Sequence, residues 1–233
     1  MLDVQGLNAW YGKAQILRDL DLSVSGGECV ALMGRNGAGK STTMKALMGL
    51  LALRSGRVQF RGHEVANWPT HRIARAGLGW VPEDRRIFTE LTVRENLAVA
   101  RRPKRDGAPF WDEAAVFELF PNLAGMATRS AARMSGGEQQ MLTIARTLMG
   151  QPYLLLLDEP SEGVAPLIVE QLAHTINRLK AQGLGVLLSE QNIHFARLVS
   201  ERAVVLEKGE LRWDGTMAGL MEDEAVQRDF LSL

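Results

Sequence analysis

One glycine-rich stretch constrains the fold of this chain more than any other: residues 34–41 read Gly-Arg-Asn-Gly-Ala-Gly-Lys-Ser. The stretch matches the phosphate-binding loop (P-loop) pattern, in which glycines let the backbone fold tightly and turn successive N–H groups toward an anion. An apolar run of strand length, Cys29–Met33, precedes it, and an amphipathic run with helical spacing, Thr42–Met48, follows it. Strand, glycine loop and helix in this order are the context that the pattern requires.

The residue types of the loop predict how it holds phosphate. Free N–H groups at a helix start, together with the positive end of the helix dipole, favour an anion there. Lys40 is expected to reach the β- and γ-phosphates of a nucleotide, and the Ser41 hydroxyl to bind the Mg2+ held between them. We therefore expect an ATP site made by Gly34, Arg35, Asn36, Gly37, Ala38, Gly39, Lys40, Ser41 and Thr42.

Composition fits one compact enzyme-sized unit of 233 residues, 46% of them hydrophobic. The 27 basic and 27 acidic residues balance, which argues against a nucleic-acid partner bound by bulk electrostatics. The single cysteine, Cys29, excludes a disulfide framework and predicts a buried, inert thiol. No apolar run approaches the ~20 residues that span a bilayer, and Met1–Val4 shows no signal-peptide pattern. We expect a cytoplasmic chain that reaches a membrane through a partner.

Hydrophobic spacing changes along the chain. Alternation predicts strands in the first 33 residues and at Gly56–Gly62 and Leu78–Val81, whereas Thr92–Gly150 is mostly helical in spacing. An all-helical insert inside an α/β chain predicts a subdomain carried on a nucleotide-binding core. We expect a single domain, 1–233, with a core of residues 1–82 and 151–233, a helical subdomain of residues 83–150, and helices near 93–101, 111–120, 136–149 and 167–181.

The basic stretch Arg101–Arg105 lies inside this insert. It has two interpretations, a nucleic-acid patch or a solvated loop. Because the stretch is short and acids elsewhere offset its charge, the solvated loop is favoured.

A second glycine-containing helix start follows at Met134–Gln140. Ser135 and Glu138 have the spacing of a capping box, which alone suffices to explain both residues. Gly136 and Gly137 weaken that explanation, because each glycine costs a helix about 1 kcal/mol relative to alanine. The two glycines make sense if a group must approach the backbone closely, and a serine hydroxyl beside bare N–H groups predicts a second anion site.

A fully apolar run, Tyr153–Leu157, ends in the carboxylates Asp158 and Glu159. Uniform hydrophobicity is typical of a central parallel strand buried on both faces, and ligands bind at the carboxyl ends of such strands. Asp158 is placed to hold Mg2+, directly or through water. Glu159 is not needed for the metal and is expected to deprotonate the attacking water as general base.

The aromatic pair Trp10–Tyr11 next to Gly12 also has two interpretations. One ring could stack on a flat base, or the pair could pack at a strand end. On residue chemistry alone, packing is favoured.

The P-loop, the Ser-Gly-Gly-Glu-Gln helix start and the Leu-Leu-Asp-Glu-Pro strand end together resemble the ATP-binding cassette family over essentially the whole chain. The resemblance implies an α/β P-loop NTPase fold: a RecA-like core with a parallel sheet, an N-terminal antiparallel β subdomain and an inserted α-helical subdomain. It also implies head-to-tail cassettes, in which Ser135 and Gly137 of one clamp the γ-phosphate of ATP on the P-loop of the other. Residues 161–163 correspond to the loop passed between the two subunits, and Tyr11 is then expected to stack on adenine instead of packing.

Three stretches, 81–88, 91–97 and 189–192, resemble an ATPase subunit of branched-chain amino-acid importers, whose relatives serve other small polar solutes. Glu83 stands where most cassettes have a glutamine that senses Mg2+ and the transmembrane partner, and Gln191 where most have a histidine that contacts the γ-phosphate. A glutamine donates a hydrogen bond but cannot carry the imidazolium charge. Two consequences stay open: slower hydrolysis by this chain alone, or reliance on the histidine of a partner cassette. His194 could be a substitute, but one helical turn further on we expect it at the surface.

The resemblance implies the ATP-hydrolysing subunit of an importer, peripheral on the cytoplasmic face of the inner (cell) membrane. The implied partners are transmembrane permease subunits, a second cassette ATPase as homo- or heterodimer and, indirectly, a solute-binding protein. The alternative is a soluble cassette ATPase acting as an assembly or repair clamp without a permease. A nucleotide kinase is disfavoured because it would not need Ser135–Gln139. Beyond the P-loop, the expected site comprises catalytic Lys40, Glu159 and Gln191, metal-binding Ser41, Asp158 and Glu83, and nucleotide-binding Tyr11, Ser135, Gly136, Gly137 and Glu138.

Overall fold

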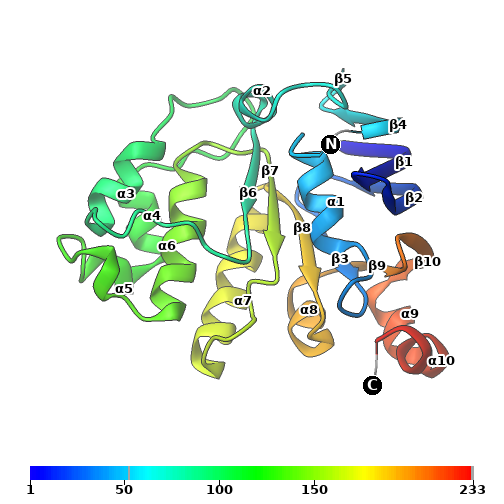
Figure 1. Ribbon diagram of the computed structural model, residues 1–233. Helices are drawn as coiled ribbons and strands as arrows, with labels where there is room; N and C mark the ends of the chain where they lie inside the picture. Colours follow the sequence, from blue (N-terminus) through cyan, green and yellow to red (C-terminus); the bar gives the residue numbers. More distant parts are fainter. Residues whose placement is uncertain (52, 232–233) are drawn as a thin grey trace.

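Two sheets organise the computed structural model, which describes residues 1–51 and 53–231 (Figure 1). The smaller sheet is antiparallel, with the strand order β2-β1-β4-β5. The larger sheet has six strands in the order β10-β9-β3-β8-β7-β6, and every neighbouring pair is parallel except β10 with β9. The strands are β1 (Leu2–Tyr11), β2 (Ala14–Val24), β3 (Cys29–Met33), β4 (Leu53–Phe60), β5 (His63–Glu64), β6 (Leu78–Val81), β7 (Leu154–Asp158), β8 (Gly185–Glu190), β9 (Arg202–Glu207) and β10 (Glu210–Thr216).

The central strands β3, β8 and β7 are buried along their whole length, as their apolar runs predict, and the burial extends to the polar ends of β7 and β8. Their alternate side chains face two separate cores. Leu155 and Leu157 pack with the helices on one face, whereas Leu154 and Leu156 pack with α1 (Lys40–Leu47) and the antiparallel sheet on the other. The parallel sheet is therefore the middle layer, and its strand ends carry the loops that form the site.

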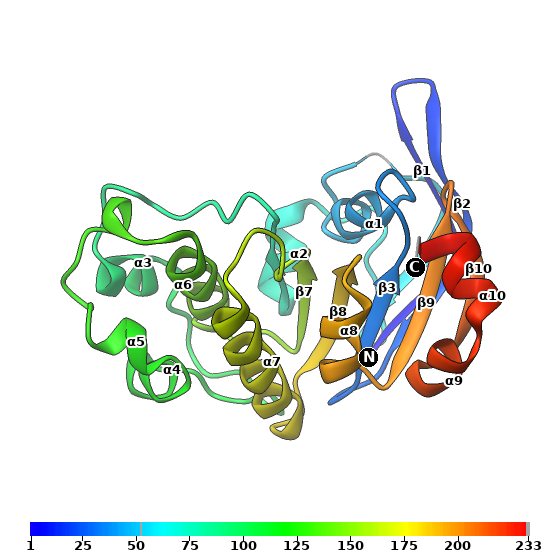
Figure 2. The same cartoon turned by 90° about the horizontal axis from the view of Figure 1, so that it is seen from below.

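Helices make up the segment between β6 and β7, as the spacing predicts. Within the described residues its one bridge, Thr92 with Ser130, is isolated. The helices gather at one end of the molecule, opposite α9 and α10 (Figure 2). The four-residue α5, which begins at a proline, was not predicted, and the expected boundaries of a helical subdomain at residues 83–150 stay a prediction. The helices of this segment are α3 (Val93–Ala100), α4 (Glu113–Leu119), α5 (Pro121–Ala124), a 3-10 turn (Ala131–Arg133) and α6 (Gly136–Leu148).

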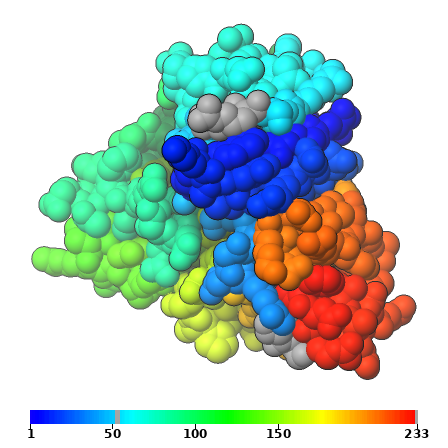
Figure 3. All heavy atoms as spheres, turned by 45° about the vertical axis from the view of Figure 1, so that its right-hand side comes forward, coloured from blue at the N-terminus to red at the C-terminus, as the bar shows by residue number. Residues whose placement is uncertain are grey.

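Among the other helices, α2 (Thr70–Ala76) escaped prediction because it is short and no side chain caps its start at Pro69. The predicted helical tail is confirmed. It lies beside β10, and both share one face of the molecule with the N-terminal strands (Figure 3). No helix in the described residues combines the length and apolar character that crossing a membrane requires. The remaining elements are α7 (Pro166–Ala181), α8 (Ile193–Val199), α9 (Met217–Glu222), α10 (Glu224–Val226) and a π-helical turn (Gln227–Leu231).

The thiol of Cys29 is fully buried in β3, as predicted, and burial raises its pKa to about 12. Because the thiolate is the reactive form, we expect no labelling of the native protein by a disulfide reagent at about pH 8, and one labelled thiol per chain after unfolding in guanidinium. Absorbance of the released chromophore measures both. Prompt labelling of the folded protein would contradict the buried position.

Candidate active site

The P-loop lies between β3 and α1, in the order that the sequence predicts. Gly39 precedes α1 with φ 113°, and no side chain caps the helix, so the N–H groups of its first turn are left to a ligand. Gly34 has φ 144°, and a Cβ there would lie 2.5 Å from the carbonyl oxygen of Leu206. Only glycine fits at this close approach.

Lys40 folds back along the loop and is buried, with 4% of its side chain exposed. Its Nζ lies 2.8 Å from the carbonyl oxygen of Gly34 and 3.4 Å from that of Arg35. The same nitrogen lies 3.1 Å from Oε1 of Glu159, whose side chain is 9% exposed. The predicted phosphate-binding cation and the predicted general base thus form an ion pair.

Asp158 and Ser41 lie close together at the carboxyl ends of the parallel strands. There the end of β7 pairs with β8 through Asp158 and Ser189. The Ser41 hydroxyl donates a hydrogen bond of 3.0 Å to Oδ1 of Asp158. Burial raises the pKa of Asp158, and the charges of Glu159 and Glu83 add to that effect.

This donor set fits Mg2+, which takes oxygen ligands and is bound by one or two protein groups together with substrate phosphates and water. Ser41 and Asp158 bring two such oxygens together. In the described part of the chain, no group of three or more His, Cys, Asp or Glu side chains is placed to hold a metal ion by itself. The predicted metal role of Glu83, which is exposed in the loop after β6, stays a prediction.

Glu159 has an unusual backbone and several partners. Its φ is 47°, a conformation that non-glycine residues rarely adopt, and its N–H donates to the Ser189 carbonyl at 3.0 Å. Gln191 Nε2 donates a hydrogen bond of 2.7 Å to Oε2 of the carboxylate. Burial raises the pKa of Glu159, but hydrogen bonds with Glu162 and Gln191 and the charge of Lys40 outweigh burial and hold it below its usual value. The carboxylate is therefore ionised at neutral pH, as a general base must be.

The start of α6 stands apart from this cluster. The capping box is complete: Glu138 N–H donates to Ser135 Oγ at 3.3 Å, and Ser135 N–H donates to Glu138 Oε2 at 2.6 Å. In the described residues, no hydrogen bond or ion pair joins residues 135–138 to the P-loop. Tyr11, at the end of β1, is 45% exposed, so packing does not account for its ring.

Side chains of this chain approach the two glycines of α6 closely, and the predicted anion site at this helix start stays a prediction. A Cβ at Gly136 would lie 2.8 Å from Nη1 of Arg85, and one at Gly137 would lie 2.9 Å from Cγ1 of Ile168. The loop after β6 and the start of α7 thus pack directly on the start of α6. His194 is exposed on α8, as expected.

Comparison with known proteins decides the family. The sequence profile described as ABC transporter matches residues 17–162, more than half of the chain. The chain belongs to the ABC transporter family. The predicted α/β P-loop NTPase fold and ATPase activity are thereby confirmed.

Relatives of this ABC family member match over nearly full length. The high-affinity branched-chain amino acid transport ATP-binding protein BraG of Pseudomonas aeruginosa is 43% identical over 99% of both chains. The lipopolysaccharide export system ATP-binding protein LptB of Haemophilus influenzae is 34% identical over 99% of this chain and 97% of its own. A solved structure described as the ATP-binding subunit of an ABC transporter is 30% identical, with a TM-score of 0.81 over 100% of this chain and 96% of its own.

The general base can be tested by Glu159→Gln. Because the amide keeps the shape of the side chain but cannot accept a proton, we expect ATP turnover to fall at least about 100-fold while ATP affinity changes less than about threefold. Phosphate release and fluorescent-nucleotide titration measure the two quantities. Glu170→Gln, an exposed carboxylate on α7, is the matched control. Unchanged turnover in Glu159→Gln would remove the assignment.

Proposed function

We propose that this ABC ATPase drives import of branched-chain amino acids or a related small polar solute. The observation that carries the ATPase chemistry is the set of contacts that joins Lys40, Glu159 and Gln191 beside the P-loop. For the solute class, BraG at 43% identity supports branched-chain amino acid transport more strongly than LptB at 34% supports lipopolysaccharide export.

In this proposal the chain's own groups share the work of hydrolysis. The N–H groups of the P-loop and Lys40 hold the phosphates, while the exposed Tyr11 ring stacks on adenine. Mg2+, held by Ser41 and Asp158, would neutralise phosphate charge. The phosphates compete with Glu159 for Lys40, so ATP binding frees the carboxylate to take a proton from the attacking water.

Gln191 also has a role in the proposed hydrolysis. In the structure its amide donates a hydrogen bond of 2.7 Å to the carboxylate of Glu159, so its N–H group already lies beside the proposed general base. It is therefore suited to orient the attacking water or the γ-phosphate, although it carries no charge.

The start of α6 serves a second cassette. Ser135 is exposed and its helix start faces no group of the P-loop in this chain. In the proposed pair, the ATP bound by one cassette therefore contacts the helix start of the other, at Ser135, Gly136, Gly137 and Glu138. Residues 161–163 lie between the two cassettes. ATP binding closes the pair, and hydrolysis reopens it.

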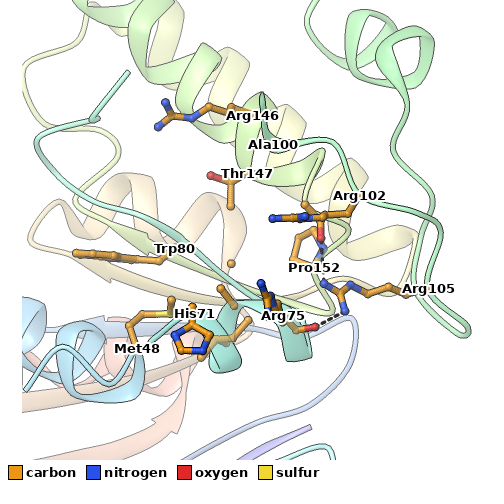
Figure 4. Close-up of a pocket in the computed structure, with 15 residues that line it drawn as sticks. Met48, His71, Arg75, Trp80, Ala100, Arg102, Arg105, Arg146, Thr147 and Pro152 are labelled. Atoms are coloured by element: carbon orange, nitrogen blue, oxygen red, sulfur yellow. Dashed lines mark hydrogen bonds between the residues drawn. The ribbon is translucent and has the colours of Figure 1, made fainter. Parts of the chain in front are cut away.

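A groove between the core and the helices is the proposed contact with the permease (Figure 4). It has a volume of about 610 Å³. Residues of α2 and β6 line one side of it, and residues of α3 and α6 line the other. A permease segment bound there would therefore contact both the core and the helices and would respond to movement of one relative to the other. The helical subdomain, residues 83–150, would pass that motion to the membrane. The lining includes Met48, Arg75, Trp80, Ala100, Arg102, Arg105, Arg146, Thr147 and Pro152.

The polar groups around the groove support the chemistry proposed for its partner. Trp80 Nε1, Arg105 Nε and Arg146 Nη1 are buried and have no hydrogen-bond partner among the described residues. Burial also lowers the pKa of the Arg105 and Arg146 guanidinium groups. A permease segment that presents carboxylate or carbonyl oxygens between apolar side chains would pair with the exposed guanidinium groups of Arg75 and Arg102. Through it the chain would lie peripherally on the cytoplasmic face of the cell membrane, and a solute-binding protein would act on the far side.

Arg102 and Arg105 of the basic stretch 101–105 lie at this groove. The expected solvated loop agrees with the exposed Arg101, Arg102 and Lys104 and is wrong only for Arg105. Both line the groove, and Arg105 is half-buried because its guanidinium donates to the carbonyl oxygens of Arg75 and Gly150. The stretch thereby joins the core to the helices.

Turnover with and without partners tests the function. We expect ATP hydrolysis by the purified chain to rise at least about fivefold when permease and second cassette are co-reconstituted in lipid, because closure of the pair completes both sites. Phosphate release at saturating ATP measures it. Full activity of the chain alone, indifferent to those partners, would favour the soluble clamp.

The groove has its own test. Arg75→Glu combined with Arg102→Glu should lower co-purification of the permease at least about tenfold, because like charges then face the proposed carboxylates. Arg197→Glu, an exposed arginine on α8 outside the groove, is the matched control and should co-purify normally. Undiminished co-purification of the groove variant would place the contact elsewhere.

A further inference from the structure

A second carboxylate, Glu190, is buried at the centre of the strand ends. It is the last residue of β8 and is 2% exposed. On one side it pairs in register with Met33, the last residue before the P-loop. On the other side its neighbour Ser189 pairs with Asp158, so Glu190 lies level with Glu159. Glu190 lies in the stretch 189–192 noted in the sequence but was assigned no role there, because the pattern does not show which loops its carboxylate contacts.

The two carboxylate oxygens of Glu190 hold two different loops. Oε1 accepts a hydrogen bond of 3.1 Å from the N–H of Ser161, in the loop that follows Glu159. Oε2 accepts hydrogen bonds of 3.2 Å from the N–H groups of Gln191 and Asn192. One rigid group therefore fixes the backbone on both sides of the Gln191–Glu159 contact.

The burial of this charge needs an explanation, because no ion pair of the described residues includes Glu190. A buried carboxylate without a cation is unfavourable unless hydrogen-bond donors replace its water. The three backbone N–H groups do so. An apolar side chain at this position would hold neither loop, so the carboxylate contributes a backbone geometry that an apolar residue could not impose.

We propose that Glu190 is a positioning residue that locks the loop of Glu159 and Ser161 to the loop of Gln191. The proposal rests on the function assigned above to Glu159 and Gln191. The two oxygens of Glu190 accept hydrogen bonds from backbone N–H groups of both loops, so it acts through the other two residues. Because residues 161–163 are proposed to meet the second cassette, Glu190 also links that loop to the residue that reaches the γ-phosphate.

Glu190→Gln separates this role from simple stability. The amide keeps the volume but has one acceptor oxygen, and its NH2 group would face a backbone donor, so one of the two loops is released. We expect kcat to fall about 10- to 100-fold, with ATP affinity changed less than about threefold and the folded fraction unchanged. Glu222→Gln, which removes an exposed carboxylate on α9, is the matched control. Equal losses of kcat and nucleotide affinity would overturn the positioning role.

A double-variant cycle tests whether Glu190 affects turnover through the Gln191–Glu159 contact. If Glu190 acts through the Gln191–Glu159 contact, Glu190→Gln combined with Gln191→Ala should lose little more kcat than the more impaired single variant. Losses that multiply would mean that the two residues act independently and would overturn the proposal.

Amide hydrogen exchange of the unmodified protein keeps the proposal testable if Glu190→Gln does not fold. The Ser161 amide should exchange at least about tenfold more slowly than that of Gly163, whose N–H has no hydrogen-bond acceptor among the described residues. Equal exchange would overturn the proposal. Full turnover of Glu159→Gln would instead overturn the general base while leaving the exchange result intact, so the two failures are distinguishable.

Discussion

The register of three parallel strands fixes the geometry of the whole site. β8 lies between β3 and β7, with Glu190 beside Met33 and Ser189 beside Asp158. The P-loop and the two acidic residues that end the run of β7 therefore emerge side by side, although about 120 residues separate them in sequence. A shift of one residue in either pairing would turn the side chains of the shifted strand to its other face. Such a shift would exchange side chains between the two packed cores and is therefore unfavourable.

Electrostatics explain why the carboxylates can gather there. Asp158, Glu159 and Glu190 lie at adjacent strand ends, with Lys40 paired to one of them. Burial, with a smaller contribution from repulsion, raises the pKa of Asp158 and Glu190, whereas side-chain hydrogen bonds and the charge of Lys40 keep the pKa of Glu159 low. Backbone N–H groups compensate Glu190, and the Ser41 hydroxyl compensates Asp158. The three carboxylates therefore lie in three different environments, and this difference is the basis of the separate roles proposed for them.

The helical segment contributes differently. Arg85 and Ile168 pack against Gly136 and Gly137, which connects the loop after β6 and the start of α7 to the start of α6. Thr143 and Arg146 of α6 donate further hydrogen bonds to the carbonyl oxygens of Arg85 and Arg86. The loop that carries Glu83 is thus attached to the helices and not only to the strand that precedes it. This attachment connects the loop that carries Glu83 to the helices that line the groove.

The sequence by itself determined the P-loop, the buried strand before Asp158 and Glu159, the capping box and the helical insert. Each of these is a local pattern whose spacing follows from the geometry of a helix, a strand or a turn. The ion pair of Lys40 with Glu159, the two-loop role of Glu190 and the unpaired donors of the groove were decided by tertiary structure alone. Each brings together residues from distant elements, and periodicity carries no information about which strand ends become neighbours. The short helix α2 was missed for a related reason, because packing and not a capping signal stabilises it.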